Sequence, residues 1–343
     1  MQIVRPIKTQ DLEKLFELAS KTGGGMTSMP VDCELLEKRI RTSVESCNGN
    51  LNGDSAKTFF MVLEDVESGD LVGTTAIYTN IGRDHPFYSY KVMRVTQRCP
   101  ELDKTKETRL LTLTNDYTGT TEIGSLFLLP EYRFGGNGSL LSRSRYMVMY
   151  NHPDRFDDKI IAEMRGYRDE NDRSPVWDHL GVHFFGMAFD EADIMSSGIG
   201  DNSFIADLMP KYPIYIDLLH PQAREAIGKL FEATAPALRM LEKEGFHYND
   251  YVDIFDGGPT VEVYRENIAT IKNTQSLTIS AFQDLPETKN KMLVSTTTSL
   301  VGFKACLADV LIKGDSVVIS ESLAIILGVG LGDQLTIAPG RAG

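Results

Sequence analysis

The sequence is poor in the features of secreted and membrane proteins. Its four cysteines are scattered and never form a C-x-x-C pair, which argues against a disulfide framework or a zinc site. No run approaches the roughly 18 uninterrupted apolar residues of a membrane-spanning helix. The opening stretch, MQIVRPIKTQDLEKLF, carries charges every few positions and lacks the apolar segment of a secretory signal. We therefore expect a cytoplasmic protein with reduced thiols.

Positive charge is also scarce. The chain has 35 Lys and Arg against 48 Asp and Glu, which gives a formal net charge of −13 and a pI near 5.0. An acidic chain without a basic run has no electrostatic reason to bind phosphate backbones or anionic lipid. Nucleic acid and membranes are therefore not expected as partners, whereas a cationic small molecule is a compatible substrate.

Hydrophobic periodicity predicts an α+β fold. The sequence of 343 residues is long enough for two or three domains. Strands are predicted over 2–6, 58–63, 71–78, 122–129, 160–167 and 182–189, and helices over 11–19, 32–44, 138–151 and 174–180. After about residue 270, short strands alternate with glycine or polar turns, which predicts a small, mainly β C-terminal subdomain.

The most informative segment is a glycine turn between a strand that ends at Pro130 and a helix. Gly136 and Gly138 lack a Cβ where the backbone must approach a ligand closely. The new helix offers unpaired N–H groups and a positive dipole end, which together predict a pyrophosphate cradle. Arg133 either contacts the phosphates or braces the turn. A Walker loop is excluded because no Gly-Lys-Ser/Thr follows, and position 141 is Leu where a dinucleotide fingerprint needs glycine.

The surroundings of this turn resemble a known superfamily. The strand L-F-L-x-P-x-Y-R directly before R-x-x-G-x-G is similar to the acyl-CoA site of GNAT acyltransferases. Residues 174–184 (SPVWDHLGVHF) resemble a later GNAT motif, and residues 235–246 repeat that signature without the glycine turn. The resemblance implies a GNAT-like α+β fold with two GNAT-like units. It divides the chain into an acyl-CoA-binding unit over 1–200, a second half without the glycine turn over 201–268, and the β subdomain over 269–343.

The same resemblance implies where the acyl-CoA lies. The end of the strand pairs with the pantetheine amides like an added strand, and the N–H groups of the turn hold the pyrophosphate. The implied cofactor-binding residues are Leu126, Phe127, Leu128, Arg133, Phe134, Gly135, Gly136, Asn137, Gly138 and Ser139.

Longer sequence segments narrow the resemblance to one family. The segments at 20–30 (SKTGGGMTSMP), 204–215 and 252–260 resemble the arginine N-succinyltransferase family, and the similarity extends over 2–265. It implies succinyl transfer from succinyl-CoA to the α-amino group of L-arginine, without a metal, in a homo-oligomer or a hetero-oligomer with a related subunit. By analogy, the early loop lines the acceptor pocket through Thr22, Gly24, Thr27 and Ser28. Asp253 and Asp256 either bind the guanidinium or only cap turns around Gly257 and Gly258.

One position departs from the family pattern. Relatives carry a histidine, assigned as proton donor, between the I-G pair and T-A-P-A, and this chain has Phe231 there. Phenylalanine cannot transfer a proton. His220 and Glu232 are the nearest candidates for that catalytic role. Otherwise the thiolate leaves unassisted, or turnover is poor.

Two alternatives to arginine succinylation therefore stay open. One is an N-acyltransferase for ornithine or another amine, or with another acyl-CoA. The other is a weakly active CoA-binding subunit that supports an active relative.

Overall fold

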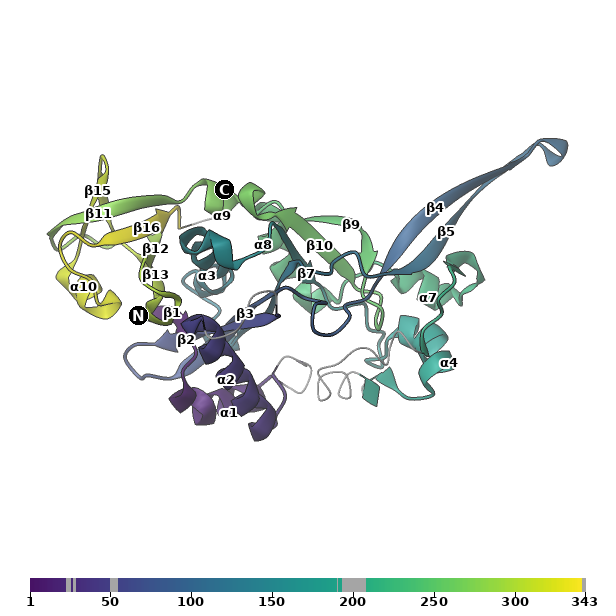
Figure 1. Ribbon diagram of the computed structural model, residues 1–343, viewed down its shortest axis with the longest axis horizontal. Coiled ribbons are helices and arrows are strands. Elements are labelled where there is room, and N and C mark those ends of the chain that lie inside the picture. The colour runs from purple at the N-terminus through teal and green to yellow at the C-terminus, as the bar shows by residue number, and fades with distance from the viewer. Residues whose placement is uncertain (23–25, 27–28, 50–54, 190, 193–207, 341–343) are drawn as a thin grey trace.

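The computed structural model describes residues 1–340 except 23–25, 27–28, 50–54, 190 and 193–207. In this part of the chain one mixed sheet of 16 strands runs through the molecule (Figure 1). Its centre follows the order β1 (Gln2–Pro6), β2 (Lys57–Asp65), β3 (Leu71–Thr79), β6 (Thr121–Leu128), β7 (Lys159–Glu163), β10 (Pro259–Tyr264) and β9 (His247–Val252). The expected α+β class is confirmed.

Helices cover both faces of this central sheet. In the view of Figure 1, α1 (Leu12–Ser20) and α2 (Cys33–Asn48) lie below the sheet, and α3 (Asn137–Asn151) lies above it. Near α3 lie the short α9 (Ala269–Lys272) and α8 (Ala235–Lys243). The amphipathic spacing of α1 explains its placement, because Leu15 and Leu18 are buried against the sheet. None of the described helices has the length and apolarity to cross a membrane.

The sheet opens between β6 and β7. These parallel strands pair only at Thr121 with Ile160 and at Glu122 with Ile161. On the β3 side the register of β6 shifts between Gly124 and Phe127, and Ser125 adopts a left-handed φ of 52°. A bulge of this kind bends a strand away from its neighbour. It therefore creates a gap in the middle of the sheet.

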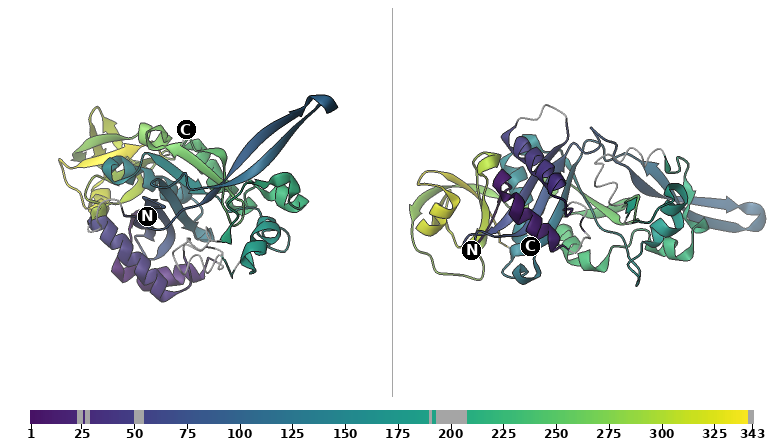
Figure 2. Two further views of the ribbon diagram at one scale, coloured as in Figure 1. Left: turned by 45° about the vertical axis from the view of Figure 1, so that its right-hand side comes forward. Right: turned by 90° about the horizontal axis from the view of Figure 1, so that it is seen from below.

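A long hairpin leaves the body of the molecule. Strands β4 (Ser89–Cys99) and β5 (Lys104–Thr114) are paired along their whole length, and their distal halves project beyond the other elements in both views of Figure 2. The base of the hairpin pairs with β9 and with β8 (Ile214–Tyr215). Most residues in the distal half of the hairpin are exposed, so hydrophobic periodicity does not predict these strands.

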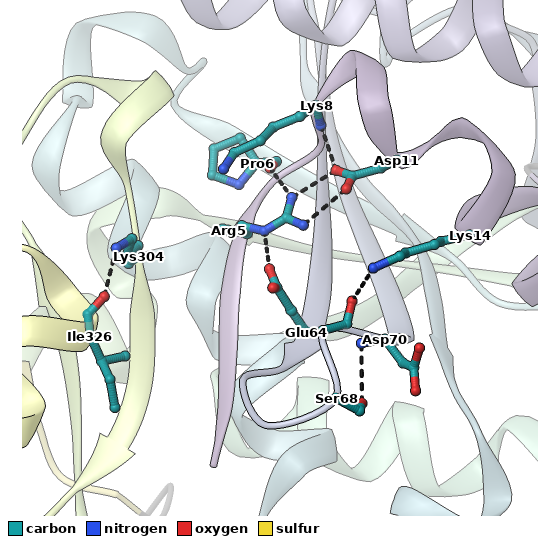
Figure 3. A network of polar contacts seen from close by, with 11 residues as sticks. Arg5, Pro6, Lys8, Asp11, Lys14, Glu64, Ser68, Asp70, Lys304 and Ile326 are labelled. Atoms are coloured by element: carbon teal, nitrogen blue, oxygen red, sulfur yellow. Dashed lines mark hydrogen bonds and ion pairs between the residues drawn. The ribbon is translucent and has the colours of Figure 1, made fainter.

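The N-terminal strand is tied to its neighbours by the buried Arg5 (Figure 3). Its guanidinium donates to both carboxylate oxygens of Asp11, at 2.7 and 3.0 Å, and also pairs with Glu64 of β2. Burial alone would raise the pKa of the Asp11 carboxyl, but the hydrogen bonds from Arg5 and from the Lys8 N–H hold that pKa below its ordinary value.

The C-terminal subdomain is built as predicted, from short strands. The helix α10 (Glu321–Leu327) packs against these strands, which are β11 (Gln275–Phe282), β12 (Met292–Thr296), β13 (Ala305–Ala308), β14 (Leu311–Lys313), β15 (Ser316–Ile319) and β16 (Gln334–Ala338). The subdomain joins the central sheet where β13 pairs with β1, at Val4 and Ala305. Lys304 also donates to the carbonyl of Ile326, at 2.6 Å, within this subdomain (Figure 3).

The predicted strand over 182–189 is wrong. Val182–Phe185 is the helix α4, which continues a π-helical turn over Trp177–Gly181. The fully buried Trp177 lies against Gly181, where an added Cβ would come within 2.3 Å of the indole Cε3. Close packing of this ring on a helical glycine explains why a sequence of high β propensity is helical here.

Residues 208–268 contribute to the same sheet. β10 pairs with β7, and β9 pairs with β10 and β4. The predicted second half therefore supplies β10 and β9, which extend the sheet beyond β7. Its boundaries at 200 and 268 stay a prediction.

Candidate functional site

A cavity of about 610 Å³ occupies the gap between β6 and β7. The α1–α2 side of the sheet contributes Thr22 and Met26, and the α3–α8 side contributes Arg145, Ala237 and Leu241. The cavity therefore has walls on both faces of the sheet. A ligand that enters the gap can contact groups on either side.

The glycine turn at the start of α3 presents free main-chain donors. Gly135 and Gly136 adopt left-handed φ values of 62° and 89°, which glycine tolerates best. Among the described residues, the N–H groups of Gly135, Gly136, Gly138 and Ser139 have no acceptor. These donors lie at the positive end of the α3 dipole. The arrangement suits a diphosphate.

Side chains of the turn brace it. Arg133 Nε donates to the carbonyl oxygen of Leu128 at 3.0 Å, and Asn137 Nδ2 donates to the carbonyl oxygen of Tyr132 at 3.1 Å. Phe134 is 60% exposed. Of the two alternatives for Arg133, bracing the turn is the one with a contact in the structure.

The end of β6 forms one wall of the cavity. Leu126 and Phe127 line it, whereas Leu128 is buried at the end of the strand. Beyond Glu122, this strand pairs with no described residue of β7. Its main-chain groups on that side are therefore open to an extended ligand that pairs like an added strand.

Two carboxylates face the cavity near the point where the strands separate. Both Glu122 and Glu163 line it, and Oε1 of Glu163 is buried with no partner among the described residues. Burial raises the pKa of Glu122 to about 7. Burial, followed by the charges of Asp253, Glu122 and Asp256, raises the pKa of Glu163 well above its ordinary value. A cation that entered this wall would relieve both effects.

Asp253 and Asp256 both line the cavity, but they also hold a turn. Asp253 Oδ1 accepts from the N–H groups of Phe255 and Asp256, at 2.7 and 2.9 Å. The two oxygens of Asp256 accept from the N–H groups of Gly258 and Gly166, at 2.8 and 2.7 Å. The main chain thus already occupies both oxygens of Asp256, which favours the turn-capping alternative at this position.

We expect Asp256→Asn to act on stability. The amide replaces one of two acceptors, leaves a buried N–H unsatisfied, and should lower the free energy of unfolding by about 1–3 kcal/mol. Denaturant unfolding measures this loss, and the KM for the acceptor should stay within about twofold because the same N–H donors occupy the group with or without substrate. A large rise in that KM at unchanged stability would instead assign Asp256 to the substrate.

The structure brings some of the other predicted residues to the cavity. Thr22 and Phe231 line it, whereas Gly24, Thr27 and Ser28 lie outside the described residues. Glu232 is exposed and is not part of the lining. His220 stacks on His179, with ring centroids 4.0 Å apart, and its Nδ1 accepts from the Gln222 N–H. Neither candidate proton donor reaches the cavity, so their catalytic roles stay predictions.

Sequence reasoning did not single out Glu122, Glu163 or Arg145. The first two sit in apolar strands, T-E-I-G and I-I-A-E-M. A carboxylate inside such an apolar strand is a signal that could have been used. Arg145 lies in a helix with buried residues on almost every side. No periodic pattern distinguishes it from a surface arginine.

Known proteins are similar to this chain in both sequence and fold. The family described as "Arginine N-succinyltransferase beta subunit" matches residues 2–270. The chain is 44% identical over 286 residues to an arginine N-succinyltransferase of Enterobacter sp. (strain 638), covering 83% of each chain. It is 43% identical over 283 residues to one from Escherichia coli O6:K15:H31, covering 82% of each.

A solved structure agrees with these relatives. It is described as arginine/ornithine succinyltransferase subunit AI from Pseudomonas aeruginosa, and it superposes with a TM-score of 0.88 at 30% identity over 99% of both chains. With a glycine turn of free amides beside an open strand edge, and with this similarity over most of its length, the chain belongs to the arginine N-succinyltransferase family of acyltransferases.

Proposed function

We propose that this acyltransferase moves a succinyl group from succinyl-CoA to the α-amino group of L-arginine in the cytoplasm. The observation that carries the proposal is the cavity between β6 and β7, which an anion cradle flanks and an acidic wall lines. The relatives named above supply the choice of succinyl and arginine.

The donor is held by main chain in this proposal. The free amides from Gly135 to Ser139 bind the diphosphate, and the open edge of β6 at Leu126 and Phe127 pairs with the pantetheine amides. An N–H of the same strand receives the oxyanion that forms when the thioester carbonyl is attacked. The proposal needs no metal.

The acceptor is held by charge. A guanidinium or an ammonium group matches the wall formed by Glu122 and Glu163. Burial raises the pKa of the Glu122 carboxyl, and burial followed by neighbouring carboxylates raises that of Glu163, so ionisation of this wall is unfavourable without a cation. Binding of a cationic substrate therefore stabilises the ionised wall.

Glu122 is our candidate for the general base. The α-ammonium group, with a pKa of ~8 or higher, must lose a proton before it can attack the thioester. A Cβ built on Gly124 would lie 3.8 Å from Glu122 Oε1, so this carboxylate lies alongside the strand just before the bulge at Ser125. Glu122 takes one proton from the α-ammonium group, and the neutral amine nitrogen bonds to the thioester carbonyl carbon. The carbon–sulfur bond then breaks, and the second proton of that nitrogen passes to the departing CoA thiolate, so that the amide and the CoA thiol are the products.

A substrate panel tests the proposed function. CoA release is followed with a thiol reagent for arginine, ornithine, lysine and agmatine, each with succinyl-CoA, acetyl-CoA and glutaryl-CoA. The pair of arginine and succinyl-CoA should give the highest kcat/KM. A higher kcat/KM for ornithine, or for another donor, would change the proposed substrates but leave the assignment as an acyltransferase intact.

Phe231→His tests whether this branch of the family needs a proton donor. We expect kcat to change by less than about tenfold, because a thiol with a pKa near 8.5 is a fair leaving group without assistance. A gain of about 10²-fold or more would show that a missing acid limits the wild-type chain. That result would favour the weakly active CoA-binding subunit.

We also propose that the chain assembles with a second copy or with a related subunit. The projecting hairpin of β4 and β5 supports this proposal, since two-stranded ribbons are marginally stable alone. Lys and Arg outnumber Asp and Glu within the hairpin, although the whole chain carries −13. A basic arm therefore complements the acidic body of a partner.

A further inference from the structure

Helix α3 carries two buried arginines with different surroundings. Arg143 and Arg145 are 4% and 2% exposed. Arg143 Nε lies 3.1 Å from a carboxylate oxygen of Glu244 and also donates to Thr270 Oγ1 at 2.7 Å. Arg145 Nε and Nη2 donate to the carbonyl and hydroxyl oxygens of Ser142, each at 2.8 Å, and its guanidinium lies over the ring of Tyr146, 5.8 Å from the centroid. Among the described residues, no carboxylate lies within ion-pair distance of Arg145.

An unpaired buried guanidinium is costly. Removal of a full charge from water is compensated only by a counter-ion or by dense hydrogen bonding. Arg143 has a carboxylate partner, although its Nη1 has no acceptor among the described residues. Arg145 has two neutral oxygens for its five N–H donors, and its only other recorded contact among the described residues is with the ring of Tyr146. The unfilled donors of Arg145 belong to a side chain that lines the cavity between β6 and β7.

The position of Arg145 indicates which anion pairs with its guanidinium. The acidic pair of Glu122 and Glu163 forms the wall for a cationic acceptor, while Arg145 lies with Ala237 and Leu241 on the α3–α8 side. This is the side on which α3 also carries the glycine turn for the diphosphate. An anionic group on that side is part of the donor. The donor's diphosphate already has its own cradle.

The geometry points to Arg145 as the receptor for the terminal carboxylate of the acyl group, which makes the enzyme selective for dicarboxylic acyl-CoA donors. This inference rests on the proposed acyl-CoA site. Arg145 offers a planar fork that matches a carboxylate in two parallel hydrogen bonds. A monocarboxylic acyl group leaves the guanidinium buried and unpaired, so the cavity discriminates against acetyl or butyryl groups by an uncompensated charge.

Calorimetric binding of succinyl-CoA and butyryl-CoA tests the inference. The two ligands have four-carbon acyl groups and differ by the carboxylate. We expect the wild-type chain to bind succinyl-CoA about 10–100-fold more tightly, as a hydrogen-bonded charge pair would give. In Arg145→Gln this preference should fall to about twofold or less, with CoA itself bound as before. Equal binding of the two esters by the wild type would overturn the inference.

Matched variants separate binding from folding. Arg143→Lys and Arg145→Lys both keep a buried cation on α3, but only Arg145→Lys should lose part of the preference for succinyl-CoA. Arg145→Gln should leave the melting temperature of the ligand-free protein unchanged or higher, because an unpaired buried charge is removed. A lower melting temperature with an intact preference would make Arg145 a structural residue.

The acceptor also contains a carboxylate, so kinetics complete the test. If Arg145 binds the acyl group, Arg145→Gln raises the KM for succinyl-CoA and leaves the KM for arginine within about twofold. A rise confined to the KM for arginine, and absent with agmatine, would assign Arg145 to the acceptor and overturn the inference. Failure of the proposed function is a separate result, since the binding preference needs no acceptor and no turnover.

Discussion

Glu122→Gln is expected to lower kcat by about 10²–10⁴-fold, which is the range for loss of a positioned general base. The glutamine keeps the size of the side chain beside Gly124 but cannot accept the proton of the α-ammonium group. Because burial raises the pKa of Glu122 to about 7 in the ligand-free protein, the wild-type kcat/KM for arginine should rise with pH through that value as the carboxylate forms. In the variant this limb of the pH profile, the rise near pH 7, should disappear. The remaining rate should increase only where the amine loses its proton to water.

Glu163→Gln is the matched control for this effect. It replaces a carboxyl group in the same wall of the cavity and, like Glu122→Gln, keeps the size of the side chain. We expect it to raise the KM for arginine about 10–100-fold, through loss of a charged contact, and to keep the pH limb near 7. If the two variants lose kcat equally and both keep the limb, the wall binds substrate and Glu122 is not the base.

Ser139→Asp should weaken binding of CoA by about 100-fold. It places a carboxylate at the helix start where the free amides are proposed to hold the diphosphate, and like charges ~5 Å apart near a protein surface repel by roughly 3 kcal/mol. The same change is favourable for the ligand-free helix, because acidic residues in a first turn complement the dipole. The variant should therefore fold normally and bind poorly, and calorimetric titration with CoA measures the loss.

Ser139→Asn isolates the charge in this experiment. Its side chain is similar in size to that of Asp and is neutral, so the Kd for CoA should stay within about threefold of wild type. The loss in Ser139→Asp should also shrink as salt is raised, since exposed charges are screened over ~10 Å at 0.1 M ionic strength. Equal losses in both variants would indicate a steric cause, and no loss in Ser139→Asp would place the diphosphate elsewhere.

Local rules predicted the parts of the fold whose signals lie close together in sequence. The strand that ends at Leu128, the glycine turn and the helix over 137–151 form one continuous motif, and the structure has all three. Asp32 caps α2 by accepting from the N–H of Leu35 at 3.0 Å, as expected for a short acidic side chain at a helix start.

The cavity itself could not be predicted in the same way. Its charged lining comes from positions far apart in sequence, Glu122, Arg145 and Glu163, and depends on how far β6 and β7 separate. That separation rests on a left-handed φ at Ser125, a residue with no strong preference for it. The error at 182–185 has a similar origin, because the indole of Trp177 packing on Gly181 favours a helix over the β propensity of the valine and phenylalanines.

A crystal structure of the chain with CoA and L-arginine would test the central claim most directly. We predict the diphosphate within hydrogen-bond distance of the amides of Gly135, Gly136, Gly138 and Ser139, with the sulfur atom in the gap beyond Glu122. A complex with the diphosphate bound away from this turn, or with the sulfur outside the opening between β6 and β7, would contradict the account.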